Sequence, residues 1–187
     1  MITLAMDTST ERAAVAVVRD GVVLAERTLE APRTQTEELI PLIDETLATA
    51  NVSVRDVDEV VVGVGPGPFT GLRVGIVTGV MLAAGLEVPV YGVLSLDACA
   101  AVHMASNSGD ESFVVTIDAK RGEVFWARYD AEGARLEGPF VGADIVGHRV
   151  YPSAAALAKV SERVAPHPVY VREPDVMAPH APKKVLG

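Results

Sequence analysis

The sequence is poor in cysteine and in basic residues, and both shortages exclude functions. Its one cysteine, Cys99, cannot form a disulfide within the chain. Sixteen Lys and Arg residues stand against 25 Asp and Glu residues, for a net charge of −9. Binding to nucleic acid depends on clustered basic side chains that displace phosphate counterions. The only adjacent basic pairs are Lys120-Arg121 and Lys183-Lys184. We therefore expect the chain to meet nucleic acid only indirectly.

Signals for export and for a membrane span are also missing. No basic segment at the N-terminus precedes an apolar run. The most apolar run, 74–86, is bounded by Arg73 and Glu87, and it is too short and too rich in glycine to span a bilayer. We expect a globular protein of the reducing cytoplasm with no membrane-bound part.

Motifs for phosphate binding and for nucleophilic catalysis are absent as well. A Walker A loop has Lys and then Ser or Thr after its last glycine, whereas Leu72 and Arg73 follow Gly71 here. A dinucleotide-binding fingerprint and a nucleophile elbow are not met either. Among the explanations for the glycines at 63–79, the sequence favours close packing, inside the chain or with a partner, over a phosphate cradle.

The segment GVGPGPFTGLRVGIVTG, at 63–79, is the most informative part of the chain. It predicts a buried strand at 59–64, a turn at 65–68, and a helix for which Thr70 is the candidate N-cap. Within that helix Gly71, Gly75 and Gly79 recur every four residues. Each glycine costs a helix about 1 kcal/mol relative to alanine. We expect another backbone to approach this glycine face closely.

Hydrophobic periodicity predicts a β-meander followed by alternating strands and helices, and then a second meander. The first half has predicted strands at 2–7, 13–18, 22–29, 59–64 and 88–93. Its predicted helices are 34–50, with Thr34 as cap and a stripe of Leu39, Ile43 and Leu47, then the glycine helix, and 96–105.

A polar stretch at 106–111 predicts a boundary between a first half, 1–107, and a second half, 108–187. The second half has predicted strands at 112–118, 123–130 and 134–141. A helix at 153–164 has an alanine face, which we expect to pack on the second sheet.

An aspartate ends the first strand of each half, Asp7 in one and Asp118 in the other. Aspartate often caps turns, and that is the simpler interpretation of either residue alone. Two aspartates at matching positions of similar meanders indicate instead a duplicated half-domain, with both strand ends facing one cleft.

Four segments together resemble the TsaB (YeaZ) family of the actin-like ATPase superfamily. They are AMDTSTERAAVAVV at 5–18, the glycine segment at 63–79, VTIDAKRGEVFWARY at 115–129 and PVYVREPD at 168–175. The resemblance implies an α/β fold of two actin-like (ribonuclease H-like) half-domains, each a mixed β-sheet flanked by helices. Relative to this family, the second half-domain is shortened at the point where the chain passes abruptly from 143–149 into the next helix.

The resemblance implies a non-catalytic protein that pairs with TsaD. TsaD transfers a threonylcarbamoyl group to the adenosine that follows the anticodon in tRNAs reading codons that begin with A. The ATPase TsaE would join the complex, and a homodimer would form without TsaD. Helices 34–50 and 70–85 would supply the interface. The residues that we predict there are Leu39, Ile43, Gly71, Leu72, Val74, Gly75, Thr78 and Gly79.

The resemblance further implies no catalytic residue, no metal and no cofactor. The TsaD paralogue holds its metal with two histidines spaced HxxxH, and no two histidines here have that spacing. Asp7, Ser9 and Thr10 are predicted to form a vestigial phosphate site. Two alternatives remain open, a small-molecule kinase of the same superfamily and a glycoprotease-like metallopeptidase.

Overall fold

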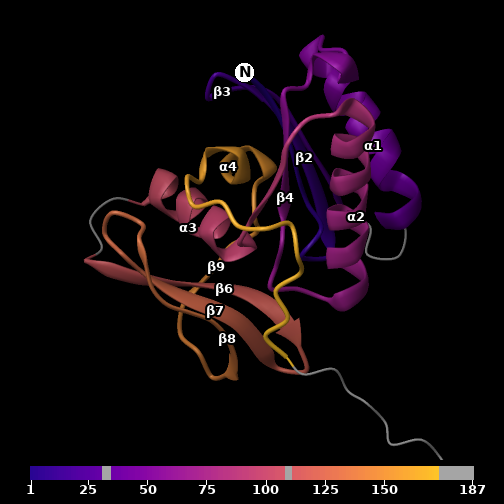
Figure 1. The fold of residues 1–187 in the computed structure, drawn as a ribbon. Coiled ribbons are helices and arrows are strands. Elements are labelled where there is room, and N and C mark those ends of the chain that lie inside the picture. The colour runs from indigo at the N-terminus through magenta and orange to yellow at the C-terminus, as the bar shows by residue number, and fades with distance from the viewer. Residues whose placement is uncertain (31–34, 108–110, 173–187) are drawn as a thin grey trace, which may run out of the picture.

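The computed structural model describes residues 1–30, 35–107 and 111–172, which form two mixed sheets with helices around them (Figure 1). The first sheet has five strands in the order β3-β2-β1-β4-β5, and the second has four in the order β8-β7-β6-β9. This confirms the predicted α/β architecture with two mixed, helix-flanked sheets.

The first sheet is a meander extended by two parallel strands. Its strands are β1 (Ile2–Asp7), β2 (Arg12–Arg19), β3 (Val22–Glu30), β4 (Glu59–Gly63) and β5 (Val90–Val93). β2 lies antiparallel to both β1 and β3, whereas β4 is parallel to β1 and β5 is parallel to β4. The all-buried run of β4 is typical of a central strand covered on both faces.

Helices α1 (Gln35–Ala50) and α2 (Phe69–Leu86) lie side by side on one face of this sheet (Figure 1). A single-turn 3-10 helix, η1 (Val54–Asp56), connects α1 to β4. The predicted stripe of Leu39, Ile43 and Leu47 is buried. These side chains belong to one core with the strand residues Leu4, Met6, Val15, Val17, Val60 and Val62. Thr34, the predicted cap of α1, lies outside the described residues.

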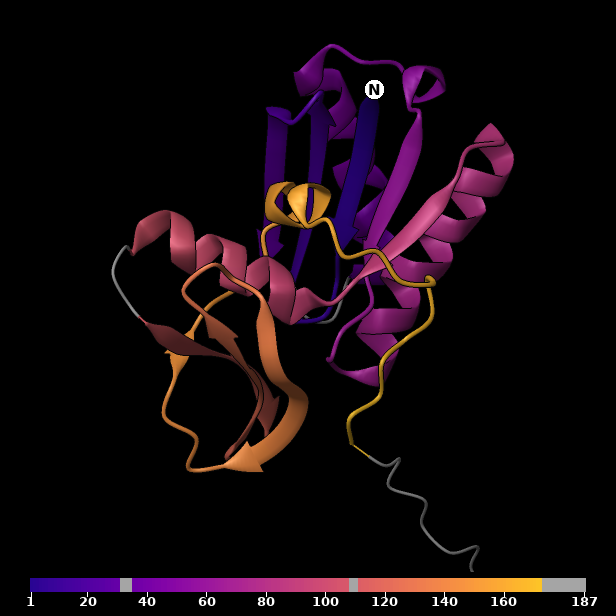
Figure 2. The same ribbon diagram turned by 60° about the vertical axis from the view of Figure 1, so that its left-hand side comes forward.

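The opposite face of the first sheet is covered by α4 (Ala154–Lys159), as Figure 2 shows. Its buried residues Ala154, Ala155 and Leu157 share a core with the small strand residues Ala5, Ala14 and Ala16. Our prediction that this helix packs on the second sheet is wrong, and the helix ends at Lys159, before residue 164. Periodicity shows which side of a helix is apolar, but it does not show which sheet receives that side.

The second sheet is built from β6 (Ser112–Lys120), β7 (Glu123–Asp130), β8 (Arg135–Ala143) and the short β9 (His148–Arg149). β6, β7 and β8 form an antiparallel meander, and β9 pairs in parallel with β6. Helix α3 (Ser95–Ser106) covers one face of this sheet. Its residues Leu96, Cys99 and Ala100 pack among Phe113, Val115, Ile117, Phe125, Ala127 and Tyr129.

After α4 the chain forms a strap, which we define as residues 164–172. Val164 exchanges two backbone hydrogen bonds with Gly92, and the Val169 N–H donates to the Val64 carbonyl at 2.8 Å. The Arg172 guanidinium then donates to the Ala119 carbonyl at 3.1 Å. The strap therefore connects the first sheet to the turn between β6 and β7. The predicted boundary after residue 107 stays a prediction, while α4 and part of the strap lie on the first sheet.

Candidate functional site

Helix α2 begins at Phe69, two residues before the start that an N-cap at Thr70 would give. Its N-cap is Pro68, at φ −60° and ψ 135°, and no side chain caps the first turn. Thr70 therefore lies inside the first turn, which corrects its prediction as N-cap. At the other end Glu87 adopts φ 58°, and its N–H donates to the carbonyls of Ala83 and Ala84. This left-handed residue ends the helix.

Gly75 and Gly79 of α2 face the first sheet. A Cβ on Gly75 would lie 2.3 Å from the Thr8 Oγ1, and one on Gly79 would lie 2.2 Å from a Val62 methyl carbon. The Thr8 hydroxyl donates to the Gly71 carbonyl at 2.7 Å and accepts from the Gly75 N–H at 3.1 Å. Close packing on the glycine face therefore occurs within the chain, but the prediction that another backbone approaches this face is wrong, because side chains of Thr8 and Val62 occupy the space beside Gly75 and Gly79.

Most of the residues predicted for a partner interface belong to the core of the monomer. Leu39, Ile43 and Leu72 are 1%, 2% and 0% exposed, and Gly75 and Gly79 are buried as well. The structure corrects these placements, because the apolar stripe that periodicity detects is already covered by the chain's own sheet. Gly71, Val74 and Thr78 are partly buried at the edge of the same contact.

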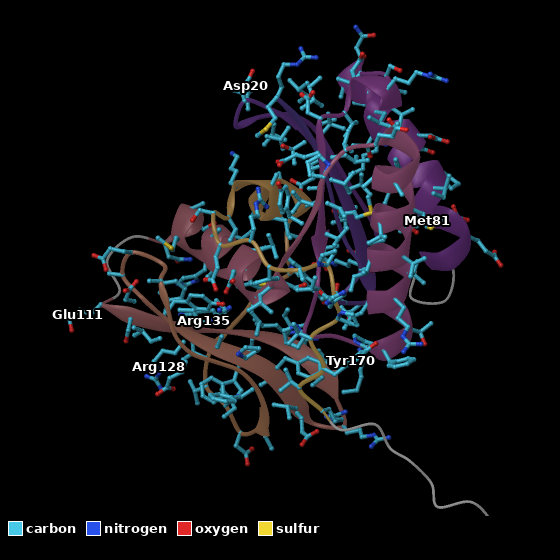
Figure 3. All side chains as sticks on the ribbon, viewed as in Figure 1. Asp20, Met81, Glu111, Arg128, Arg135 and Tyr170 are labelled. Atoms are coloured by element: carbon cyan, nitrogen blue, oxygen red, sulfur yellow. The ribbon has the colours of Figure 1, made fainter. Side chains whose placement is uncertain are left out.

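Large apolar side chains are also exposed on the solvent side of the same two helices. We define this α1–α2 outer face by Ile40, Phe69, Val77 and Met81, which are 47%, 51%, 57% and 66% exposed. Met81 can be followed on α2 in Figure 3. Sequence reasoning missed these residues, although apolar side chains outside the core stripe of a helix were the available signal.

Helix α2 is also the one described helix that is long and apolar enough, by length and composition alone, to cross a membrane. It is longer than the apolar run 74–86, because Phe69 to Arg73 are part of it. Only 28% of the helix is buried in the monomer. Much of its apolar surface therefore faces outward.

An aromatic cluster stands at the start of α2. The rings of Phe69 and Tyr170 stack with centroids 5.3 Å apart, and the Arg73 guanidinium carbon lies 3.8 Å from the Phe69 ring centroid. The Arg73 Nε also donates to the Tyr170 hydroxyl at 3.1 Å. Tyr170 comes from the strap and is 43% exposed. The strap thus adds a side chain to the exposed surface of α2.

Asp7 is the centre of a buried polar turn. Its Oδ1 accepts from the Ser9 N–H at 2.8 Å and from the Ser9 hydroxyl at 2.6 Å, and its Oδ2 accepts from the Ser95 hydroxyl at 2.6 Å. A Cβ on Gly63 would lie 1.9 Å from Oδ2, so the carboxylate fits only beside a glycine. Burial raises the pKa of Asp7, against hydrogen bonds from Ser9 and Ser95 that favour the charged form.

The turn after Asp7 is covered by the glycine–proline loop. A Cβ on Gly67 would lie 2.3 Å from the Ser9 carbonyl oxygen, and Ser9 is fully buried. The Thr10 hydroxyl accepts from the Arg12 N–H at 3.0 Å. The predicted residues Asp7, Ser9 and Thr10 do come together, but their polar atoms bond within the chain. Among the described residues, no three His, Cys, Asp or Glu side chains gather as metal ligands.

Asp118 has a more open environment than Asp7. Like Asp7, it accepts the N–H two residues ahead, from Lys120 at 2.7 Å, so both aspartates cap turns, which is the simpler of the two interpretations of the sequence. That both strand ends face one cleft stays a prediction. The Lys120 ammonium lies 2.9 Å from the Asp118 carboxylate and 3.7 Å from that of Glu11. It therefore connects the end of β6 to the turn between β1 and β2. Partial burial raises the pKa of Asp118, but hydrogen bonds from Lys120 outweigh it and the pKa is lowered.

The fold and the closed turn at Asp7 define an α/β protein of two mixed sheets with an exposed pair of helices. The structure resembles that of YeaZ from Pseudomonas aeruginosa, with a TM-score of 0.76 and 25% identity over 90% of this chain and 99% of that one. A second P. aeruginosa structure, described as similar to peptidase YeaZ, gives a TM-score of 0.79 and 26% identity over 91% of this chain and 99% of that chain.

The family model described as "TsaD: tRNA N6-adenosine threonylcarbamoyltransferase" matches residues 23–178. The chain is 40% identical over 129 residues to the Escherichia coli tRNA threonylcarbamoyladenosine biosynthesis protein TsaB, covering 69% of this chain and 55% of that protein. A Mycobacterium tuberculosis protein is 45% identical over 142 residues, which cover 75% of this chain and 64% of the relative. The chain therefore spans less than two thirds of the curated relatives it matches.

The chain belongs to the family that this model describes and, within it, to the TsaB (YeaZ) proteins.

Proposed function

We propose that the protein is a non-catalytic partner of TsaD in the formation of N6-threonylcarbamoyladenosine in tRNA. The family and the names of its TsaB relatives support this pathway. The observation that carries the proposal is the α1–α2 outer face, whose four large apolar side chains are about half exposed or more. An apolar surface of this kind on a monomer is typical of a docking site.

Covering this face would contribute part of the energy that a specific complex needs. Complete burial of a large aliphatic or aromatic side chain contributes roughly 1.5–3 kcal/mol. For the remaining exposure of Ile40, Phe69, Val77 and Met81 we expect about half of that from each residue. The sum, about 4 kcal/mol, offsets a substantial part of the entropy lost on association.

The polar turn at Asp7 supports a non-catalytic role. Asp7, Ser9 and Ser95 use their polar atoms on one another, and the loop at Gly67 covers Ser9. In our proposal this turn stabilises the first sheet and holds neither cofactor nor metal. With a net charge of −9, the chain would contact tRNA only through its partner.

The remaining parts of the proposal concern the assembly. TsaE would join through the complex with TsaD, and a homodimer would use the same α1–α2 outer face when TsaD is absent. The complex would act in the cytoplasm.

The test is to mix the protein with TsaD from the same organism and to measure the mass by light scattering after size exclusion. We expect a one-to-one complex from the wild type, and its loss in Met81→Asp, which places a charge on the outer face. Leu136→Asp is the control, because Leu136 is similarly exposed at 56% but lies on β8.

Other outcomes would overturn the proposal. Two separate peaks from the wild type would exclude the partnership. Micromolar binding of ATP with magnesium would favour the kinase alternative, and stoichiometric zinc or iron would favour the metallopeptidase.

A further inference from the structure

We propose that Arg73, which contacts both Phe69 and Tyr170, is the electrostatic anchor of the α1–α2 outer face and binds a carboxylate of the docking partner. The inference rests on the proposed function and adds the chemistry of the partner. The partner would be an apolar helix face with an Asp or Glu at the end that meets Arg73.

The side chain of Arg73 is oriented before any partner arrives. Its Nε donates to the Tyr170 hydroxyl at 3.1 Å, and the central carbon of its guanidinium lies 3.8 Å from the centroid of the Phe69 ring. Phe69 and Tyr170 in turn stack on each other with 23° between their planes. An arginine that is already oriented loses less entropy when it binds, and its two terminal amino groups can form a bidentate pair with a carboxylate.

The surroundings of Arg73 explain why the partner must supply the charge. Arg73 is the single charged residue of α2, and Val77 and Met81 follow it one and two turns along the same exposed side. Docking on these apolar residues would remove water from the guanidinium. A charge that loses its water is costly unless an opposite charge replaces it. Among the described residues, none of the carboxylates forms an ion pair with Arg73.

The contact between Tyr170 and Arg73 depends on the tertiary structure. It lies 97 residues beyond Arg73 in the chain and is held next to α2 by the hydrogen bond between Val169 and Val64. Figure 3 shows Tyr170 near the lower end of α2. Aromatic and arginine side chains of this kind contribute most of the binding energy in many interfaces. The anchor therefore combines the residue types and the rigidity expected of an interface centre.

The experiment measures the Kd of the full chain for TsaD by calorimetry at two salt concentrations. We expect Arg73→Gln to weaken binding about 30-fold, the size of a typical hot-spot loss, and to reduce the salt dependence of the Kd. Tyr170→Phe keeps the ring stack but removes the hydroxyl, and we expect about 3-fold weaker binding. Arg128→Gln is the matched control, because Arg128 is an exposed arginine that pairs with Glu137 on the second sheet at 3.4 Å.

The results separate this inference from the proposed function. If the wild type binds TsaD and Arg73→Gln binds within twofold of Arg128→Gln at both salt concentrations, the anchor is refuted while the partnership stands. If the wild type does not bind, both are refuted. Thermal unfolding of each variant is the control for misfolding. We expect the midpoint temperatures to match that of the wild type, because Arg73 is exposed.

Discussion

The two sheets begin with the same arrangement of strands, but they differ in the segment that connects the third strand of each sheet to the next one. Each starts with an antiparallel meander and adds a strand parallel to its first strand, β4 beside β1 and β9 beside β6. In the first sheet, residues 31–58 connect β3 to β4 and include α1, whereas residues 144–147 alone connect β8 to β9. A sheet without crossover helices of its own must obtain its cover from elsewhere in the chain.

Each half of the sequence supplies one helix that covers the sheet of the other half. Met6, next to Asp7, packs in the core with α1 and α2, while Ile117, next to Asp118, packs in the core with α3. Helix α3 comes from the first half of the sequence, and α4, on the first sheet, comes from the second half. The two helices also contact each other. This exchange connects the two halves of the sequence.

Helix α3 is further fixed to the second sheet by a partly buried carboxylate, that of Asp97. Asp97 accepts from the Tyr129 hydroxyl at 2.7 Å and from the Arg135 guanidinium at 2.9 Å and 3.0 Å. Burial raises the pKa of Asp97, while the bond from Tyr129 and the charge of Arg135 oppose that rise. The other face of this sheet has no described helix, and Leu136 and Phe140 remain 56% and 49% exposed there.

The strongest test of the comparison is to remove the two equivalent aspartates. We expect Asp7→Ala to lower the free energy of unfolding by about 3–4 kcal/mol, because it leaves buried donors of Ser9 and Ser95 without an acceptor. Asp118→Ala should cost no more than ~1 kcal/mol, since its partners Lys120 and Arg149 are solvated. Urea denaturation gives both values. Equal losses would show that the two turns are equally important.

A smaller effect is expected where α2 meets the first sheet. Gly75→Ala should destabilise the protein by about 2 kcal/mol, because its Cβ would overlap the Thr8 side chain. Gly85→Ala lies in the same helix with nothing within 4 Å of its Cβ, and it should stabilise by up to ~1 kcal/mol. Thermal unfolding of both variants measures the difference. A harmless Gly75→Ala would mean that α2 does not need its close approach.

The smallest expected effect is a difference in the sign of pH dependence. The pKa of Asp7 is raised in the folded state, so its contribution to stability is fully present below the ordinary value and is lost as the pH rises through the folded pKa. The pKa of Asp118 is lowered, so its contribution is present above the ordinary value and is lost as the pH falls.

The two asparagine variants measure these contributions separately. Relative to the wild type, Asp7→Asn should gain stability as the pH rises from ~3 to ~6, and Asp118→Asn should lose it. Chemical denaturation at several pH values follows both variants. The same slope for the two would contradict the opposite environments of the aspartates.

Much of the secondary structure could be predicted from the sequence. The short apolar run of β1 and the 3.6-residue pattern of α1 are local signals, so both elements lie within a residue or two of their predicted bounds. The turn after Asp7 is also local, because the aspartate bonds the N–H two residues on. The candidate site was harder to predict, since its residues are defined by what the core leaves exposed.

The sequence by itself determined the described strands other than β9, the glycine helix, the two turn-capping aspartates and the family, because these depend on neighbouring residues or on short motifs. Only the tertiary structure decided that Gly75 and Gly79 face the sheet, that α4 covers β1 and β2, and that Tyr170 lies against Arg73. The physical reason is the same in each case. An apolar or small surface is buried against whichever surface it fits best, and that surface lies far away in the chain.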